Sequence, residues 1–127
     1  YGQKQVQIWR RSYDIPPPQM EPEHPYKNKI KSDILSESLK DTFNRVVPYF
    51  NKKIKPFILS NKNILIVFHG NSCRALLKEI LNISEKKIIE FEIPTGNPLL
   101  IRFEENFKVK DYKYLDEKRA KKILFDI

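Results

Sequence analysis

Two kinds of hydrophobic pattern run along this chain, and they predict a mixture of helices and strands. The apolar run 64–68 is unbroken and contains three β-branched residues, which favours a strand covered on both faces. A hairpin-like pair of strands is expected at 99–103 and 109–114. A long helix is predicted where apolar residues recur at three- and four-residue spacing, at Leu39, Phe43, Val46, Val47, Phe50, Ile54 and Phe57.

Shorter helices are predicted around these elements. Residues 2–9 have the pattern of the end of a helix, and Ser36 is expected to cap the long helix, which we expect to kink or break near Pro48. Ser84 is expected to cap a short helix, and residues 117–124 to form a final amphipathic one.

The stretch 16–36 is predicted to be a loop, because it holds five prolines and no apolar periodicity. A mobile lid over a site is one role for such a loop. The alternation of helices and strands places the chain in the α/β class. We therefore treat residues 1–127 as part of a single domain.

The end of the apolar run carries the first candidate chemistry. His69 follows the strand directly, Gly70 permits a sharp turn that a Cβ would hinder, and Asn71 or Ser72 can cap a helix over 73–81. The carboxyl end of a strand and the N-terminus of a helix both favour anions. The imidazole could donate to a phosphate oxygen or shuttle a proton. A histidine that merely ends a strand is the alternative.

The second candidate is the pair Arg10 and Arg11, which follows Trp9 and precedes the proline run 16–18. Two adjacent guanidiniums held beside a stiff segment could clamp a carboxylate or a phosphate, because a planar guanidinium forms bidentate hydrogen bonds with both. The alternative is a solvated turn with Trp9 packed inward.

The composition narrows the choice of partners. The formal net charge is +8, yet the lysine pairs are scattered at 52–53, 86–87 and 121–122, with no basic stripe interleaved with aromatics, so we expect no nucleic-acid partner. No transmembrane stretch or signal peptide is present, which predicts a cytoplasmic protein without a membrane partner.

The metal-ligating residue types are sparse. His24 is expected to be an exposed loop residue, and no spacing of His and Cys suggests a metal site. Cys73 is the only cysteine, which excludes an internal disulfide. It is either a thiol of lowered pKa at a helix start or a small packing residue.

Several blocks of the chain resemble one family. They are residues 5–18, 37–42, 45–49, 69–72 with 74–76, and 93–99. In this order they are similar to the cofactor-dependent phosphoglycerate mutases of the histidine phosphatase superfamily, from the first residue to about Tyr114. The resemblance implies a three-layer fold with a mostly parallel central sheet.

The resemblance also implies roles for the candidate residues. His69 matches the histidine that stabilises the transition state of phosphoryl transfer. Gly70 and Asn71 match the substrate-contacting pair, and Arg10 and Arg11 match the arginines that engage the carboxylate and phosphate of the substrate. The implied reaction interconverts 3- and 2-phosphoglycerate in glycolysis and gluconeogenesis, through a phosphohistidine and with 2,3-bisphosphoglycerate as cofactor. A homo-oligomer is expected for the complete protein.

The family's nucleophilic histidine lies in an Arg-His-Gly segment and its acid/base glutamate in an Asn-Glu-Arg-His-Tyr-Gly segment, and neither occurs here. We therefore expect the chain to be the carboxyl-terminal half of a mutase domain, inactive by itself. A related histidine phosphatase or a bisphosphoglycerate mutase/phosphatase is one alternative. A basic module that binds anions or RNA is another.

Overall fold

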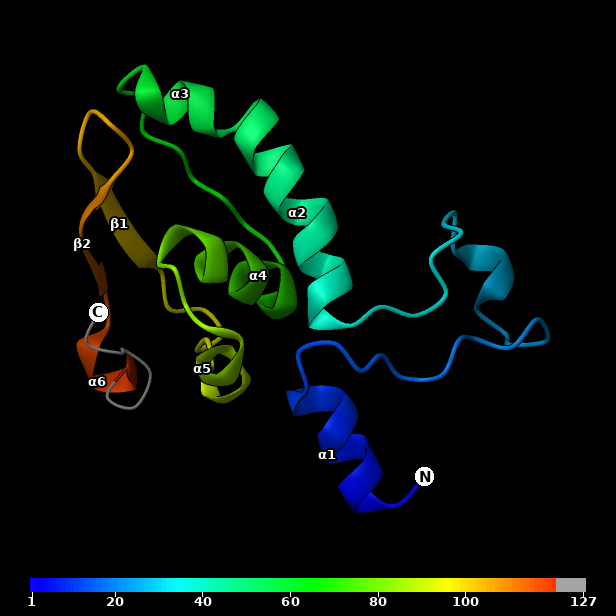
Figure 1. The fold of residues 1–127 in the computed structure, drawn as a ribbon. Coiled ribbons are helices and arrows are strands. Elements are labelled where there is room, and N and C mark those ends of the chain that lie inside the picture. Colours follow the sequence, from blue (N-terminus) through cyan, green and yellow to red (C-terminus); the bar gives the residue numbers. More distant parts are fainter. Residues whose placement is uncertain (121–127) are drawn as a thin grey trace.

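The computed structural model describes residues 1–120, which form helices around one short hairpin (Figure 1). In chain order the elements are α1 (Gln3–Arg11), the 3₁₀ helix η1 (Lys27–Lys29), α2 (Leu39–Lys53), α3 (Lys55–Leu59), α4 (Gly70–Ile80), α5 (Glu85–Glu90), β1 (Leu99–Phe103), β2 (Val109–Tyr114) and α6 (Glu117–Ala120). The chain therefore has an α/β structure. The predicted helix 117–124 is present as α6 to Ala120, and its remainder lies outside the described residues.

The hydrophobic core lies where α4 packs against α2 and where α5 and the hairpin close over it (Figure 1). Ala75 of α4 and Ile88 of α5 have no exposed surface. Tyr13 is buried in the same cluster, and its carbonyl accepts a hydrogen bond of 2.8 Å from the Lys40 N–H. Tyr13 thus fixes the chain that leaves α1 against the start of α2. The other buried members of the cluster are Leu39, Leu77, Leu81, Ile83 and Phe91.

The long helix α2 begins at a capping box. The Ser38 hydroxyl accepts from the Asp41 N–H at 3.1 Å, and the Asp41 carboxylate accepts from the Ser38 N–H at 2.9 Å. The prediction that Ser36 caps this helix is wrong, because the Ser36 hydroxyl instead donates to the Pro17 carbonyl. The helix continues through Pro48, and the break falls at Ile54, between α2 and α3.

The hairpin and the short helix α5 match their predicted positions. β1 and β2 pair antiparallel with Leu99 opposite Tyr114. The Ser84 hydroxyl caps α5 by accepting from the Lys87 N–H at 3.2 Å. The side chain of Asn97, buried before β1, donates to the Asp116 carbonyl at 2.9 Å and accepts from the Asp116 N–H at 3.0 Å. This pair ties the two ends of the hairpin together.

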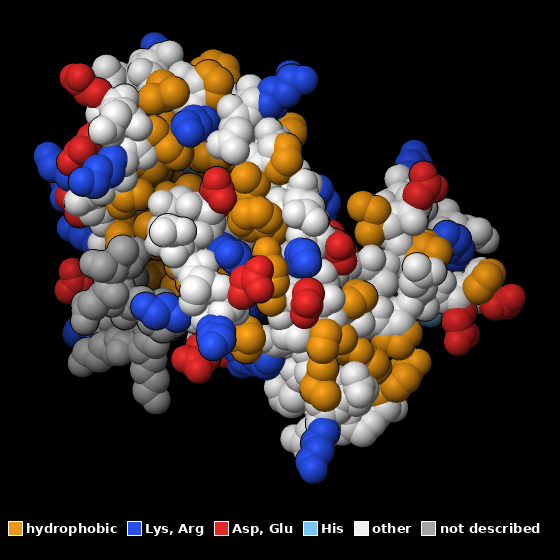
Figure 2. Space-filling model, in the orientation of Figure 1, with side chains coloured by type: hydrophobic (Ala, Val, Ile, Leu, Met, Phe, Trp, Pro, Cys, Tyr) orange, Lys and Arg blue, Asp and Glu red, His pale blue; other side chains and the backbone are white. Residues whose placement is uncertain are grey.

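The segment 64–68 is extended but forms no strand among the described residues. The prediction of a covered strand is therefore wrong for this structure. Leu65 and Val67 are 88% and 89% exposed, and no backbone hydrogen bond joins the segment to the rest of the described chain. Hydrophobic side chains also reach the surface elsewhere on the face seen in Figure 2. An extended apolar segment forms a β-strand only when a neighbouring strand makes hydrogen bonds with its N–H and C=O groups.

The stretch 16–36 is a loop, as predicted, and η1 lies in the part of it that is distant from α2 and α4 (Figure 1). Its two ends are joined where the Met20 N–H donates to the Leu35 carbonyl at 3.2 Å. The remainder projects away from α2 and α4 (Figure 1). Ile34 and Tyr26 are more than half exposed.

The capping box gives a prediction for stability. Ser38→Ala removes the side chain that satisfies the Asp41 N–H, so we expect the free energy of unfolding to fall by about 1 kcal/mol, within the usual 0.5–2 kcal/mol for a lost cap. Ser72→Ala is the matched control, since the Ser72 hydroxyl makes no hydrogen bond within the described residues. Urea unfolding followed by circular dichroism measures both, and equal losses would contradict the assignment.

Candidate functional site

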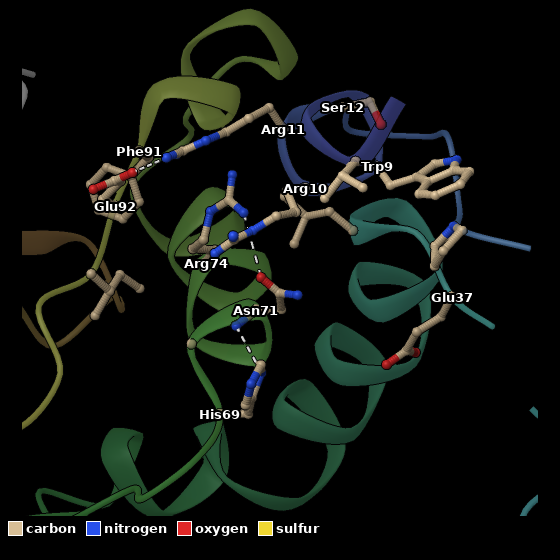
Figure 3. Close-up of a pocket in the computed structure, with 15 residues that line it drawn as sticks. Trp9, Arg10, Arg11, Ser12, Glu37, His69, Asn71, Arg74, Phe91 and Glu92 are labelled. Atoms are coloured by element: carbon tan, nitrogen blue, oxygen red, sulfur yellow. Dashed lines mark hydrogen bonds and ion pairs between the residues drawn. The ribbon is translucent and has the colours of Figure 1, made fainter. Parts of the chain in front are cut away.

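A pocket of about 660 Å³ lies between the end of α1, the start of α4 and the segment after α5 (Figure 3). Arg10, Arg11, His69, Gly70 and Asn71 all line it. The structure thus brings together every residue that the sequence placed in a site. No parallel sheet edge lies beneath the pocket in the described chain, because 64–68 is unpaired.

His69 itself caps α4. The helix begins at Gly70, and the His69 Nδ1 accepts from the Asn71 N–H at 3.3 Å. The prediction that Asn71 or Ser72 is the cap is therefore wrong, because the helix starts three residues earlier than expected. Since Nδ1 is an acceptor, a neutral His69 carries its proton on Nε2, which is free to donate.

The prediction that Gly70 permits a turn that a Cβ would hinder is wrong. Its backbone is not in the left-handed region, and a Cβ at this position would meet no atom within 4 Å. The turn into α4 therefore does not require a glycine. What the missing side chain leaves is open space beside the first N–H groups of the helix, where the helix dipole favours an anion.

The two arginines of α1 have different surroundings. Both lie in its last turn, and the Arg11 Nη2 donates to the Glu92 carboxylate, which forms an ion pair between α1 and the segment after α5 (Figure 3). No such partner is found for the Arg10 side chain among the described residues. Trp9, on the same turn, is half-buried and packs edge-on against Tyr1, with ring centroids 4.7 Å apart.

Arg74 is a pocket residue that sequence reasoning missed as a site residue. It is only 9% exposed, and its Nη2 donates to the Ile88 carbonyl at 2.6 Å, while Nη1 reaches the Asn71 Oδ1 at 3.5 Å. Its Nε is buried without a hydrogen-bond partner. Burial lowers the pKa of the guanidinium, and the charge of Arg11 adds to this. The available signal was an arginine on the apolar face of its helix, three residues before Leu77.

Two carboxylates also line the pocket. Glu37 receives two hydrogen bonds from Arg45, at 2.7 and 2.6 Å. Hydrogen bonding by Arg45 is the main cause of the lowered pKa of Glu37. Glu92 is the other and pairs with Arg11. No local pattern predicts this second pair, because Arg11 and Glu92 are 81 residues apart.

Cys73 is a packing residue. It is partly covered and lies against the hydrophobic core, and burial raises the pKa of its thiol to about 12. The alternative of a lowered pKa is therefore wrong, because the loss of hydration outweighs the field of the helix N-terminus.

Chemically, the arrangement suits a small anion with more than one charge. Three arginines, Arg10, Arg11 and Arg74, line the same pocket as His69, Gly70 and Asn71 at the start of α4, and guanidiniums and helix N-termini both favour anions. Among residues 1–120, no group of three or more His, Cys, Asp or Glu side chains could hold a metal ion. In the same part of the chain, no helix has the length and hydrophobicity needed to cross a membrane.

The pocket thus lies at the start of a helix that follows an extended apolar segment, in a chain of α/β structure. The family model described as histidine phosphatase superfamily (branch 1) matches residues 3–113. The chain therefore belongs to this superfamily.

Among its relatives is a protein of Treponema denticola named 2,3-bisphosphoglycerate-dependent phosphoglycerate mutase. It is 49% identical over 126 residues, which cover 92% of this chain and 51% of the relative. A protein of the same name from Haemophilus influenzae strain PittEE is 45% identical over 125 residues, or 91% of this chain and 55% of the relative. The chain spans about half the length of the curated relatives it matches.

The raised pKa of Cys73 gives a prediction for reactivity. We expect the thiol to react with Ellman's reagent at pH 8 at least about tenfold more slowly in the folded chain than in urea, because the thiolate is the reacting form. As the chain has one cysteine, the absorbance change reports on this site alone. Equal rates in the two states would show that the thiol is not protected.

Proposed function

We propose that this chain forms the carboxyl-terminal half of a 2,3-bisphosphoglycerate-dependent phosphoglycerate mutase, an isomerase that interconverts 3- and 2-phosphoglycerate in glycolysis and gluconeogenesis. The observation that carries the proposal is the pocket in which the arginines of α1 face the N-terminus of α4. The names of the relatives from Treponema denticola and Haemophilus influenzae support it.

Substrate binding follows from the donors in the pocket. A phosphoglycerate carries a carboxylate and a phosphate, and Arg10 and Arg11 can each form a bidentate pair with one of them. The N–H groups of Gly70 and Ser72 have no acceptor within the described residues, so an oxygen of the ligand can take that place. Because Gly70 lacks a Cβ, such an oxygen can approach closely. The Asn71 amide adds a further donor.

His69 acts as a stabiliser in this proposal. With Nδ1 held by the Asn71 N–H, Nε2 donates to the phosphoryl group while it moves between donor and acceptor oxygen. Charge on the equatorial oxygens of the phosphoryl group is stabilised by positioned donors, which is the main source of catalysis in phosphoryl transfer. His69 does not form the covalent bond.

The remaining parts would come from the amino-terminal half that the relatives possess. These are the histidine that carries the phosphoryl group and the glutamate that exchanges the hydroxyl proton. Strands of that half would pair with 64–68, whose exposed side chains and unpaired backbone suit a central strand, to give a three-layer fold with a mostly parallel sheet. The cofactor 2,3-bisphosphoglycerate supplies the phosphoryl group that loads the histidine.

Three further features belong to the proposal. The loop 16–36 would act as a lid, since Pro17 at its base already lines the pocket. The complete protein would work in the cytoplasm, where phosphoglycerates occur, and would form a homo-oligomer.

The first test is complementation. We expect the chain alone to convert no 3-phosphoglycerate in an enolase-coupled assay, because it lacks the nucleophilic histidine. Refolding it with the amino-terminal half of the Treponema denticola relative should produce turnover, since the two then supply all the parts. Turnover by the chain alone above a heat-treated sample, or none after complementation with a correctly folded product, would contradict the proposal.

The second test concerns His69. In the complemented protein, His69→Ala should lower kcat by roughly 10²- to 10³-fold, the usual loss for one transition-state donor. His24→Ala is the matched control, because this other histidine is exposed in the loop and, within the described residues, its side chain contacts the nearby Tyr26 and no pocket residue. A similar kcat for both variants would remove His69 from the chemistry.

A further inference from the structure

One carboxylate of the pocket, that of Glu92, is paired with Arg11, a residue that the proposed function assigns to substrate binding. The Glu92 carboxylate accepts from Arg11, and the side chains are 57% and 46% exposed, respectively. The other carboxylate, Glu37, is bound on both oxygens by Arg45, which does not line the pocket. Within the described pocket lining, Glu92 is thus the carboxylate that is paired with a pocket arginine.

The arginines around Glu92 hold it in its charged form. The hydrogen bond from Arg11 is the main cause of its lowered pKa, and the charges of Arg11, Arg74 and Arg10 contribute. The Glu92 carboxylate thus forms its ion pair with Arg11, and the charges of Arg74 and Arg10 also favour its ionised form. An incoming phosphate or carboxylate meets the same guanidiniums.

We propose that Glu92 is an internal competitor of the substrate: its carboxylate occupies Arg11 in the empty pocket, is displaced by the ligand's anionic group, and so sets the affinity of the site. This inference rests on the proposed function, because it assigns Arg11 to the substrate.

The exposure of the ion pair makes such an exchange feasible. A solvated pair of this kind contributes little, so an anion with several charges can replace it. Once displaced, Glu92 remains beside the pocket and repels the bound anion, which weakens binding further and speeds release of product. A site that must release a product as charged as its substrate gains from such a residue.

Trp9 allows the inference to be tested on the chain itself. It is the only tryptophan and it lines the pocket, so its fluorescence can report on a bound anion. The probes are inorganic phosphate and 3-phosphoglycerate, titrated at low ionic strength. We expect Glu92→Gln to lower the Kd for both by about 2- to 10-fold, because the amide neither competes strongly for Arg11 nor repels the anion.

Glu90→Gln is the matched control. It removes the same charge two residues away, from an exposed side chain at the end of α5 that makes no ion pair within the described residues. We expect its Kd to equal that of the unchanged chain. The gap between the two variants should narrow when Arg11 is replaced by Gln, because the competition is then gone. It should also narrow as KCl is added, since exposed charges are screened.

Each outcome decides the inference. A Kd for Glu92→Gln that is unchanged, higher, or lowered only as much as in Glu90→Gln overturns it, and so does a failure of every variant to bind either probe. Circular dichroism of each variant confirms that the fold is kept. If Glu92→Gln binds more tightly and Glu90→Gln does not, the competitor role stands, even if the complemented protein turns over no phosphoglycerate and the proposed function fails.

Discussion

The packing of α4 against α2 is the interaction on which the site depends. One face of α4 is buried in the core through Ala75 and Leu77, and this fixes the direction of the helix. Its N-terminus, with His69, Gly70 and Asn71, therefore stands at a fixed place beside α1. The buried guanidinium of Arg74 strengthens this arrangement, because it joins α4 to the Ile88 carbonyl of α5 at 2.6 Å.

Charge balance is the second constraint on the pocket. Three arginines gathered around one space repel each other, and the lowered pKa of Arg74 reflects both its burial and the charge of Arg11. Glu92 balances part of this charge through its ion pair with Arg11. Since the Glu92 side chain is more than half exposed, it stays in contact with solvent while it pairs with the guanidinium.

The extended segment 64–68 has a sequence that favours a strand, but no second strand pairs with it within the described residues. Its β-branched and aromatic residues favour a strand, but hydrogen bonds from a second strand are required to make one. The exposed surface of Leu65 and Val67 is the kind that proteins cover by packing or by association. It fits the proposal in which the other half of the domain lies against this segment.

The sequence by itself determined the elements whose signals are local. The alternation in 99–103 and 109–114 is enough to define the hairpin, and Ser84 is enough to define the start of α5. The candidate site residues, Arg10 and Arg11 with His69 to Asn71, could be named from their short motifs and from the order of the family-like blocks, and they line one pocket. The tertiary structure decided what depends on distant partners. Whether Ser36 or Ser38 caps α2 was decided by which hydroxyl meets Asp41 and which meets Pro17. The pairing of Arg11 with Glu92 and the burial of Arg74 arise only when α1, α4 and α5 meet, because charges and packing act through space and not along the chain.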